Sequence, residues 1–85
     1  MPSFKDTLGW IYYQQGDYKN AIPLLEQAAA ELPDRPLVRY HLGMSYIAIG
    51  ELAKATEQLK KAHELALDNS ALQTKIKAAQ EKAAI

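Results

Sequence analysis

Apolar residues recur at intervals of three and four along most of this chain, and that spacing places them on one face of an α-helix. Glycine, proline, aspartate or asparagine separates each apolar segment from the next. No segment alternates apolar and polar residues with a period of two, so the pattern predicts no β-strand. We expect an all-α fold of five helices, between residues 3 and 16, 17 and 33, 34 and 50, 51 and 67, and 70 and 85.

Residues that favour caps and turns mark the expected ends of the first two helices. Ser3 is expected to cap the first helix, with Asp6 three residues later in the arrangement of a capping box. Gly16 ends that helix, because glycine adopts the left-handed backbone conformation at no steric cost. Asp17 is expected to cap the second helix and Pro33 to stop it, since proline has no N–H to continue the helical ladder.

The later helices carry similar boundary signals. Pro23 falls in the second turn of the second helix, where it removes one backbone donor but lies too early to break the helix. The Asp-Arg-Pro segment at 34–36 is expected to start the third helix with a cap and a proline in the first turn. Ser70, with Gln73 three residues later, has the spacing of a capping box at the start of the fifth helix.

The chain also contains an internal repeat: identical residues recur at one constant distance along the sequence, which is the distance from Leu8 to Leu42. Identical residues recur at this spacing: Leu8 and Leu42, Gly9 and Gly43, Tyr12 and Tyr46, Gly16 and Gly50, Ala21 and Ala55, Leu25 and Leu59, and Ala28 and Ala62. A fixed spacing in this range is typical of stacked helical repeats. We expect the small residues to let neighbouring helices approach closely, and the two tyrosines to fill the space that remains.

These residues resemble the tetratricopeptide repeat family, whose 34-residue pattern combines Leu-Gly, Tyr, Gly-Asp-Tyr, Ala, a bulky residue, Ala and Pro. The first repeat matches the pattern through Gly16-Asp17-Tyr18 and Pro33, whereas the second has Leu52 for the tyrosine and Leu67 for the proline. An early aromatic position of the family is occupied by Lys5 and Arg39, so that packing contact is missing or differently filled.

The resemblance implies a right-handed solenoid of two helix–turn–helix repeats, at 2–35 and 36–69, with a C-terminal capping helix at 70–85. The fifth helix is rich in Ala, Lys, Gln and Glu, which gives it high helix propensity and a soluble outer face. The segment 6–10 is also similar to the last repeats of longer bacterial repeat proteins, some of them linked to exopolysaccharide assembly.

The family implies a protein-interaction module without catalysis of its own, in which the first helix of each repeat lines a concave groove. Helical geometry selects the side chains that turn away from each hairpin core. The candidate groove residues are Asp6, Trp10, Tyr13, Leu37, Tyr40, His41, Met44 and Ile47, and the fifth helix would add Thr74, Lys75 and Ala78. This groove is aromatic and apolar, with Asp6 and His41 as its polar features.

Such an apolar surface has two interpretations. It is either a partner-binding surface, in which Trp, Tyr and Met are enriched, or a set of residues that the protein buries itself, with Trp10 packed under the third helix. Some relatives hold the C-terminal carboxylate of a chaperone peptide with lysine, asparagine and arginine side chains in this groove. Here Asp6, Trp10, Leu37 and His41 occupy the corresponding positions, which argues against that ligand.

Composition excludes several other functions. Ten basic and ten acidic residues cancel, and no basic block offers the positive face that a nucleic-acid binder needs. The absence of cysteine excludes disulfides and thiolate metal sites. His41 and His63 lack the spacing of convergent zinc ligands. No nucleophile–base pair or phosphate-binding loop is present, so we expect neither an enzyme nor a cofactor. The longest uncharged stretch is too short to span a bilayer.

The sequence therefore predicts a scaffold that binds a peptide or helix of a partner protein through this groove. The alternative is a structural or self-assembling terminal piece of a longer solenoid, with no separate ligand and with a second copy covering an exposed end. Both cytoplasm and, for a piece of an exported bacterial protein, periplasm fit a chain without cysteine.

Overall fold

The structure, a computed structural model, describes residues 3–84, which form five α-helices and no strand. The helices are α1 (Ser3–Gln14), α2 (Tyr18–Glu31), α3 (Pro36–Ala48), α4 (Leu52–Leu65) and α5 (Ser70–Ala83). The all-α prediction is confirmed. Residues 2 and 85, which begin and end the expected repeats, lie outside the described part of the chain, as does the side chain of Ser3.

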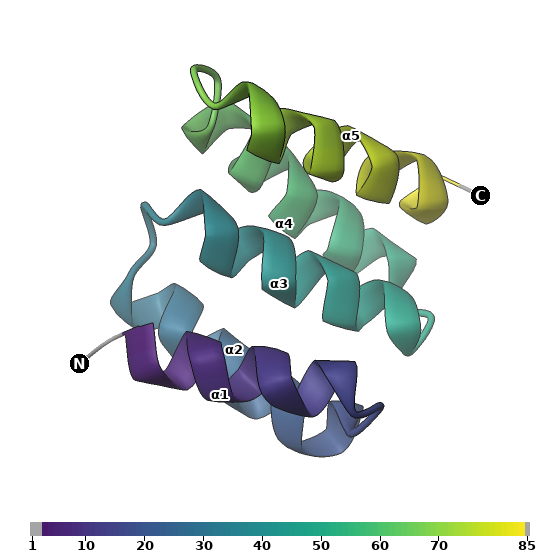
Figure 1. Cartoon of the computed structure of the whole chain (residues 1–85). Coiled ribbons are helices and arrows are strands. Elements are labelled where there is room, and N and C mark those ends of the chain that lie inside the picture. Colours follow the sequence, from purple (N-terminus) through teal and green to yellow (C-terminus); the bar gives the residue numbers. More distant parts are fainter. Residues whose placement is uncertain (1–2, 85) are drawn as a thin grey trace.

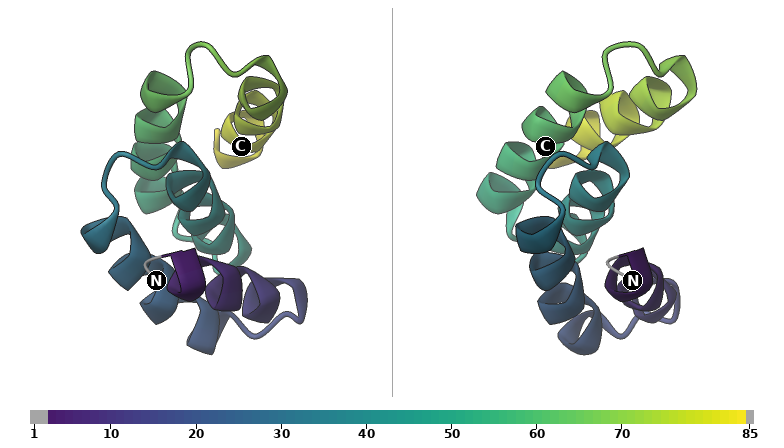
Figure 2. Two further views of the ribbon diagram at one scale, coloured as in Figure 1. Left: turned by 60° about the vertical axis from the view of Figure 1, so that its left-hand side comes forward. Right: turned by 90° about the vertical axis from the view of Figure 1, so that its left-hand side faces the viewer.

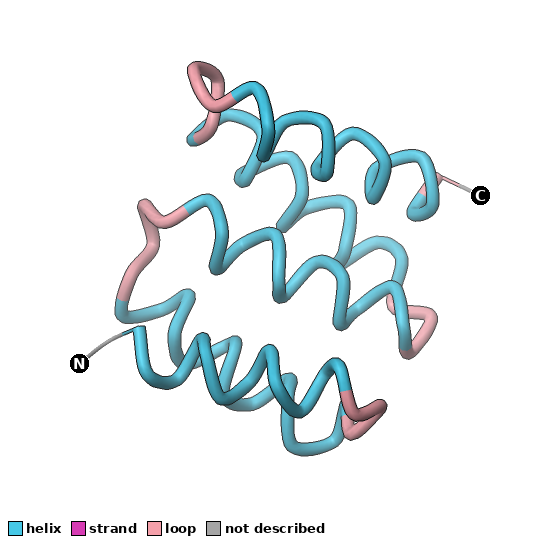
Figure 3. Tube along the Cα trace, viewed as in Figure 1, coloured by secondary structure: helices cyan, strands magenta, loops and turns pink. Residues whose placement is uncertain are grey.

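The helices form two layers. In Figure 1, α1, α3 and α5 lie in front with their N-terminal ends on the same side, and α2 and α4 lie behind them. Short connections join α1 to α2 and α3 to α4 as antiparallel hairpins, and each helix packs against the next in the chain (Figure 3). The turned views in Figure 2 show the hairpins stacked one on the other, with α5 at the end of the stack. Sequential packing therefore brings the three front helices side by side.

The turns inside the hairpins follow the expected backbone chemistry. Gly16 and Gly50 have φ values of 78° and 80°, a region that other residues adopt only with strain. After the first turn, Asp17 caps α2 by accepting a hydrogen bond from the backbone N–H of Asn20. The helix continues through Pro23, as expected for a proline near its start.

Two predicted helix starts are wrong in detail. The N-cap of α3 is Arg35, which makes no side-chain capping bond, although Pro36 occupies the first turn as expected. At α5 the cap is Asn69, whose side chain accepts from the N–H of Leu72 at 3.1 Å. Gln73 does not complete a capping box, because its side chain hydrogen-bonds the ring Nδ1 and the backbone carbonyl of His63. A tertiary contact between α4 and α5 thus replaces a local one.

The core depends on two close approaches between helices. A Cβ atom on Gly9 would lie 2.8 Å from Cγ of Leu25, and one on Gly43 would lie 2.8 Å from Cγ of Leu59. Both leucines are fully buried. Each glycine therefore leaves the space into which the leucine of the paired helix packs, which confirms the role that the repeat predicted for these glycines.

Lys5 and Arg39 occupy positions where the resembled family has an aromatic residue, and both make polar links instead. The Lys5 ammonium pairs with the Glu31 carboxylate and so ties α1 to the end of α2. Arg39 donates from Nη1 to the side-chain oxygen of Gln58 at 2.9 Å and from Nε to the carbonyl of Pro33 at 3.3 Å. The guanidinium thereby bridges α3 to α4 and to the preceding connection.

A tyrosine joins the two hairpins. The Tyr46 hydroxyl donates a hydrogen bond to the carboxylate of Glu26, so α3 is tied to α2 across the boundary between the repeats. Burial of the ring raises the pKa of Tyr46, and the hydrogen bond to Glu26 raises it further because the carboxylate disfavours a phenolate. The folded state therefore holds this proton more tightly than the unfolded chain does.

We predict that Gly43→Leu prevents folding or causes aggregation, because its side chain would occupy the space of Leu59. Gly43→Ala should lower the free energy of unfolding by roughly 1–3 kcal/mol, the usual cost of overpacking. Ala53→Leu is the control, because it places the same leucine side chain at an exposed position of α4. A cooperative thermal melt of Gly43→Leu close to that of the wild type would contradict this packing.

We further predict that stability falls as the pH rises above about 10, the pKa of an unfolded tyrosine. The contribution from Tyr46 is fully present below that pH, and it is lost as the pH rises toward the raised pKa of the folded state. Urea midpoints at pH 8 and pH 11 measure the loss. Tyr46→Phe should be less stable at pH 8 by about 1 kcal/mol but should lose less stability between the two pH values. An equal loss in both proteins would refute the assignment to Tyr46.

Candidate functional site

The front helices bring the predicted aromatic residues into one cluster. The Trp10 ring of α1 stacks on Tyr13 of the same helix, with centroids 4.5 Å apart and planes 6° apart. Its position also places it against the His41 ring of α3, at 3.9 Å and 17°, and near Tyr40, at 6.2 Å. We call the surface formed by α1, α3 and α5 around these rings the first-helix face. The cluster joins the two repeats, although its members are far apart in the chain.

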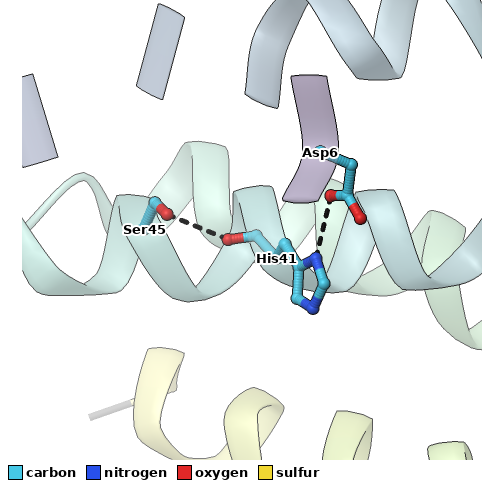
Figure 4. Close-up of polar contacts among 3 residues, drawn as sticks. All are labelled: Asp6, His41 and Ser45. Atoms are coloured by element: carbon cyan, nitrogen blue, oxygen red, sulfur yellow. Dashed lines mark hydrogen bonds and ion pairs between the residues drawn. The ribbon is translucent and has the colours of Figure 1, made fainter. Parts of the chain in front are cut away.

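Asp6 of α1 forms a buried pair with His41 of α3, whose ring stacks on Trp10 (Figure 4). The carboxylate Oδ1 of Asp6 lies 2.8 Å from Nδ1 of His41, and each residue is only 7% exposed. The ring nitrogen and the carboxylate share one hydrogen bond, in which the ring donates when the carboxylate is ionised. Ser45 is also buried and donates from Oγ to the His41 carbonyl at 3.0 Å. Both polar groups that were expected to face a ligand are therefore paired within the protein.

The other predicted groove residues keep part of their surface. Leu37 is 46% exposed, whereas Tyr13, Tyr40, Met44 and Ile47 are half-buried and pack along the edge of the core. Trp10 is half-buried as well, because His41 and the tyrosines cover its ring. The first-helix face thus combines the two interpretations: its polar pair is internal, and its aromatic and aliphatic side chains remain partly accessible.

Burial raises the pKa of Tyr13 and of Tyr40, and the nearby Tyr18 and Tyr40 raise that of Tyr13 further. Both side chains therefore keep their phenolic protons at neutral pH and can donate a hydrogen bond from the first-helix face. Tyr18 also lies against Tyr13, with ring centroids 5.6 Å apart, and extends the aromatic cluster toward α2.

A cavity of about 510 Å³ adjoins this face, where the N-terminal ends of the three front helices meet the connections that precede α3 and α5. Asp6 and Leu37 line it, as do Thr7, Leu32, Arg35, Pro36, Val38, Asn69, Ala71, Leu72 and Lys75. Of these residues, Asp6, Leu37 and Lys75 were singled out from the sequence. The lining residues in and next to the two connections were missed, because helix periodicity predicts the face on which a residue lies but does not predict which connection covers the end of a helix.

The cavity has an apolar wall and two cations. Leu32, Val38 and Leu72 contribute the wall, and the side chains of Arg35 and Lys75 are the cationic groups that line it. Over the residues that the structure describes, the ion pairs join Lys5 to Glu31, Asp6 to His41 and Lys61 to Glu57, and none involves Arg35 or Lys75. These two cations are therefore available to an acidic group in the cavity.

The second histidine takes part in a contact between α4 and α5. His63 is hydrogen-bonded to Gln73, and within residues 3–84 no group of three or more His, Asp or Glu side chains is gathered as metal ligands. In the same described part of the chain, no helix has the length and apolar character needed to cross a bilayer.

The chain was compared with known proteins. A family model described as tetratricopeptide repeat matches residues 12–79, from the end of α1 into α5. No curated protein matches the chain significantly.

We predict that Asp6→Ala lowers the free energy of unfolding by about 1–3 kcal/mol, because it leaves the buried His41 Nδ1 without its acceptor. Trp10 fluorescence reports the change, since its ring stacks on His41. Asp34→Ala, which removes an exposed carboxylate, is the matched control. In a double-mutant cycle with His41→Ala, additive losses would show that the two side chains do not stabilise each other.

Proposed function

Because the chain belongs to the tetratricopeptide repeat family, we propose that it binds a peptide or helix of a partner protein across its first-helix face. Domains of this family are generally protein–protein interaction modules and are typically non-catalytic scaffolds. The binding segment would lie over α1, α3 and α5 and contact Trp10, Tyr13, Tyr40 and Leu37.

The observation that carries this proposal is the aromatic cluster beside an apolar cavity. Partly buried Trp and Tyr rings supply large contact areas with few rotatable bonds, and such residues are enriched at the energetic centres of interfaces. The rings of Trp10 and Tyr13 are held in place by stacking on each other and on His41. A partner would therefore meet a surface that is already ordered, which reduces the entropy lost on binding.

The cavity favours one aliphatic side chain of the partner next to an acidic group. Its volume of about 510 Å³ accommodates a leucine- or isoleucine-sized side chain with its backbone, and Leu32, Val38 and Leu72 would remove that side chain from water. The charges of Arg35 and Lys75 would pair with a neighbouring carboxylate. Recognition of an acidic group would thus rest on Arg35 and Lys75. The positions used by relatives that bind chaperone tails hold Asp6, Trp10, Leu37 and His41 here and would not supply the pairing cation.

Selection of peptides from a displayed random library on the immobilised chain tests the proposal. We expect the selected sequences to combine an aliphatic residue with an acidic one, and to bind with an affinity that falls as salt is added. Leu37→Ala, within the first-helix face, should weaken their binding about tenfold. Leu67→Ala removes the same side chain from an exposed position outside this face and is the matched control.

Tyr40→Ala and Met44→Ala extend the test, provided that their thermal melts stay close to that of the wild type. Equal binding by the Leu37 and Leu67 variants would overturn the proposed site. A sedimentation experiment separates the alternative: a concentration-dependent mass that Leu37→Ala abolishes would mean that a second copy occupies the face.

A further inference from the structure

The spacing of the internal repeat also relates α3 to α5, and it does so through buried residues. Three positions of α3, occupied by Val38, Leu42 and Ser45, correspond at this spacing to Leu72, Ile76 and Ala79 of α5. All six residues are buried, with exposed fractions between 0% and 8%. The two helices therefore use the same face to pack against the hairpin that precedes them.

The corresponding face of α1 is largely exposed. Subtracting the same spacing from Val38, Leu42 and Ser45 gives Phe4, Leu8 and Ile11, which we call the α1 outer stripe. Phe4 is 65% exposed, Ile11 is 43% exposed and Leu8 is half-buried. These residues lie three and four positions apart, so they form one continuous apolar face of the helix.

The interfaces inside the molecule show what covers such a face. The second helix of each hairpin packs on the next front helix: α2 with Ala28 and Ala29 against α3, and α4 with Ala62 and Ala66 against α5. Ala28 and Ala62 are equivalent positions of the repeat, and both are 0% exposed. Small side chains let the covering helix approach closely, and the larger apolar side chains of the front helix fill the groove between its turns.

We propose that the α1 outer stripe docks an amphipathic helix of a partner protein, one that presents small residues toward the stripe as the covering faces of α2 and α4 do toward α3 and α5. Phe4 and Ile11 would then lose their contact with water, as Val38 and Leu72 do inside the molecule. The partner chemistry is that of the second helix of another hairpin of this kind, docked in trans.

A second folded copy of the chain offers no matching helix within its described residues. The faces of this type on α2 and α4 are already buried by α3 and α5. The exposed surface of α5, at the other end of the stack, includes Lys75, Lys77 and Lys82, which an apolar stripe would leave unpaired. The described stack therefore ends in a polar surface on α5 and in an apolar stripe on α1.

The stripe is independent of the first-helix face. Around the axis of α1, Trp10 and Tyr13 point away from the stripe by more than a quarter turn, since each residue advances the helix by about 100°. A helix on the stripe would thus leave the peptide-binding surface free, and the chain could join two partners at once.

The test titrates the full chain with a helix-stapled peptide of residues 51–67, which carries the covering face of α4 without a proline. Backbone amide NMR shifts locate the bound peptide. We expect shifts along Phe4, Leu8 and Ile11, a higher melting temperature with peptide, and at least a tenfold loss of affinity in Ile11→Asp. Ala53→Asp adds the same charge to an exposed position of α4, which does not contact α1, and should bind as the wild type does.

The same peptide with Ala62→Asp should not bind, because its small contact residue is replaced by a charge. Shifts confined to α3 and α5 would mean that the peptide replaces the chain's own α4, and would overturn the proposal. So would binding that survives Ile11→Asp but is lost in Leu37→Ala, which would assign the peptide to the first-helix face. A dimer of the chain alone that Ile11→Asp dissociates would replace the partner helix with a second copy.

Discussion

The structure depends on a glycine opposite a leucine inside each hairpin. Gly9 and Gly43 allow Leu25 and Leu59 to pack where a Cβ atom would otherwise lie 2.8 Å away. This close contact excludes water from both leucines, which are fully buried. Because both hairpins use the same contact at equivalent positions of the repeat, they have the same shape and can stack with their front helices side by side. A small domain buries a limited fraction of its surface, so the packing of each leucine against its glycine is a large part of the core of this chain.

Stacking then creates the polar contacts between hairpins. The Asp6–His41 pair joins α1 to α3, and the Tyr46–Glu26 bond joins α3 to α2. A buried pair of this kind adds little stability when complete but costs much when one partner is lost. It therefore favours one register of the hairpins over others. The Trp10 ring lies on His41, so the same register positions the aromatic cluster of the proposed binding face.

The two proposed surfaces differ in origin. The first-helix face arises where three helices and two connections meet, and its cavity is lined by the cations Arg35 and Lys75. The α1 outer stripe arises because, in the described part of the chain, α2 covers the equivalent face of α3 and α4 covers that of α5. No described helix covers the face of α1. Phe4 and Ile11 are apolar for the same packing reason as Val38 and Leu72, yet they remain exposed to water.

The helices, their glycine turns and the family could all be predicted from the order of the amino acids, because these follow from local backbone preference and from a repeat spacing that can be counted. The residues of the aromatic cluster could be selected in the same way, since a helix places positions three and four apart on one face. Three contacts could not be predicted and emerge only from the folded chain: Asp6 pairs with His41, Gln73 binds His63 and not its own helix start, and Arg35 and Lys75 line one cavity. These residues are distant in the chain, so their contacts depend on how the helices rotate and stack, and no local pattern records that geometry.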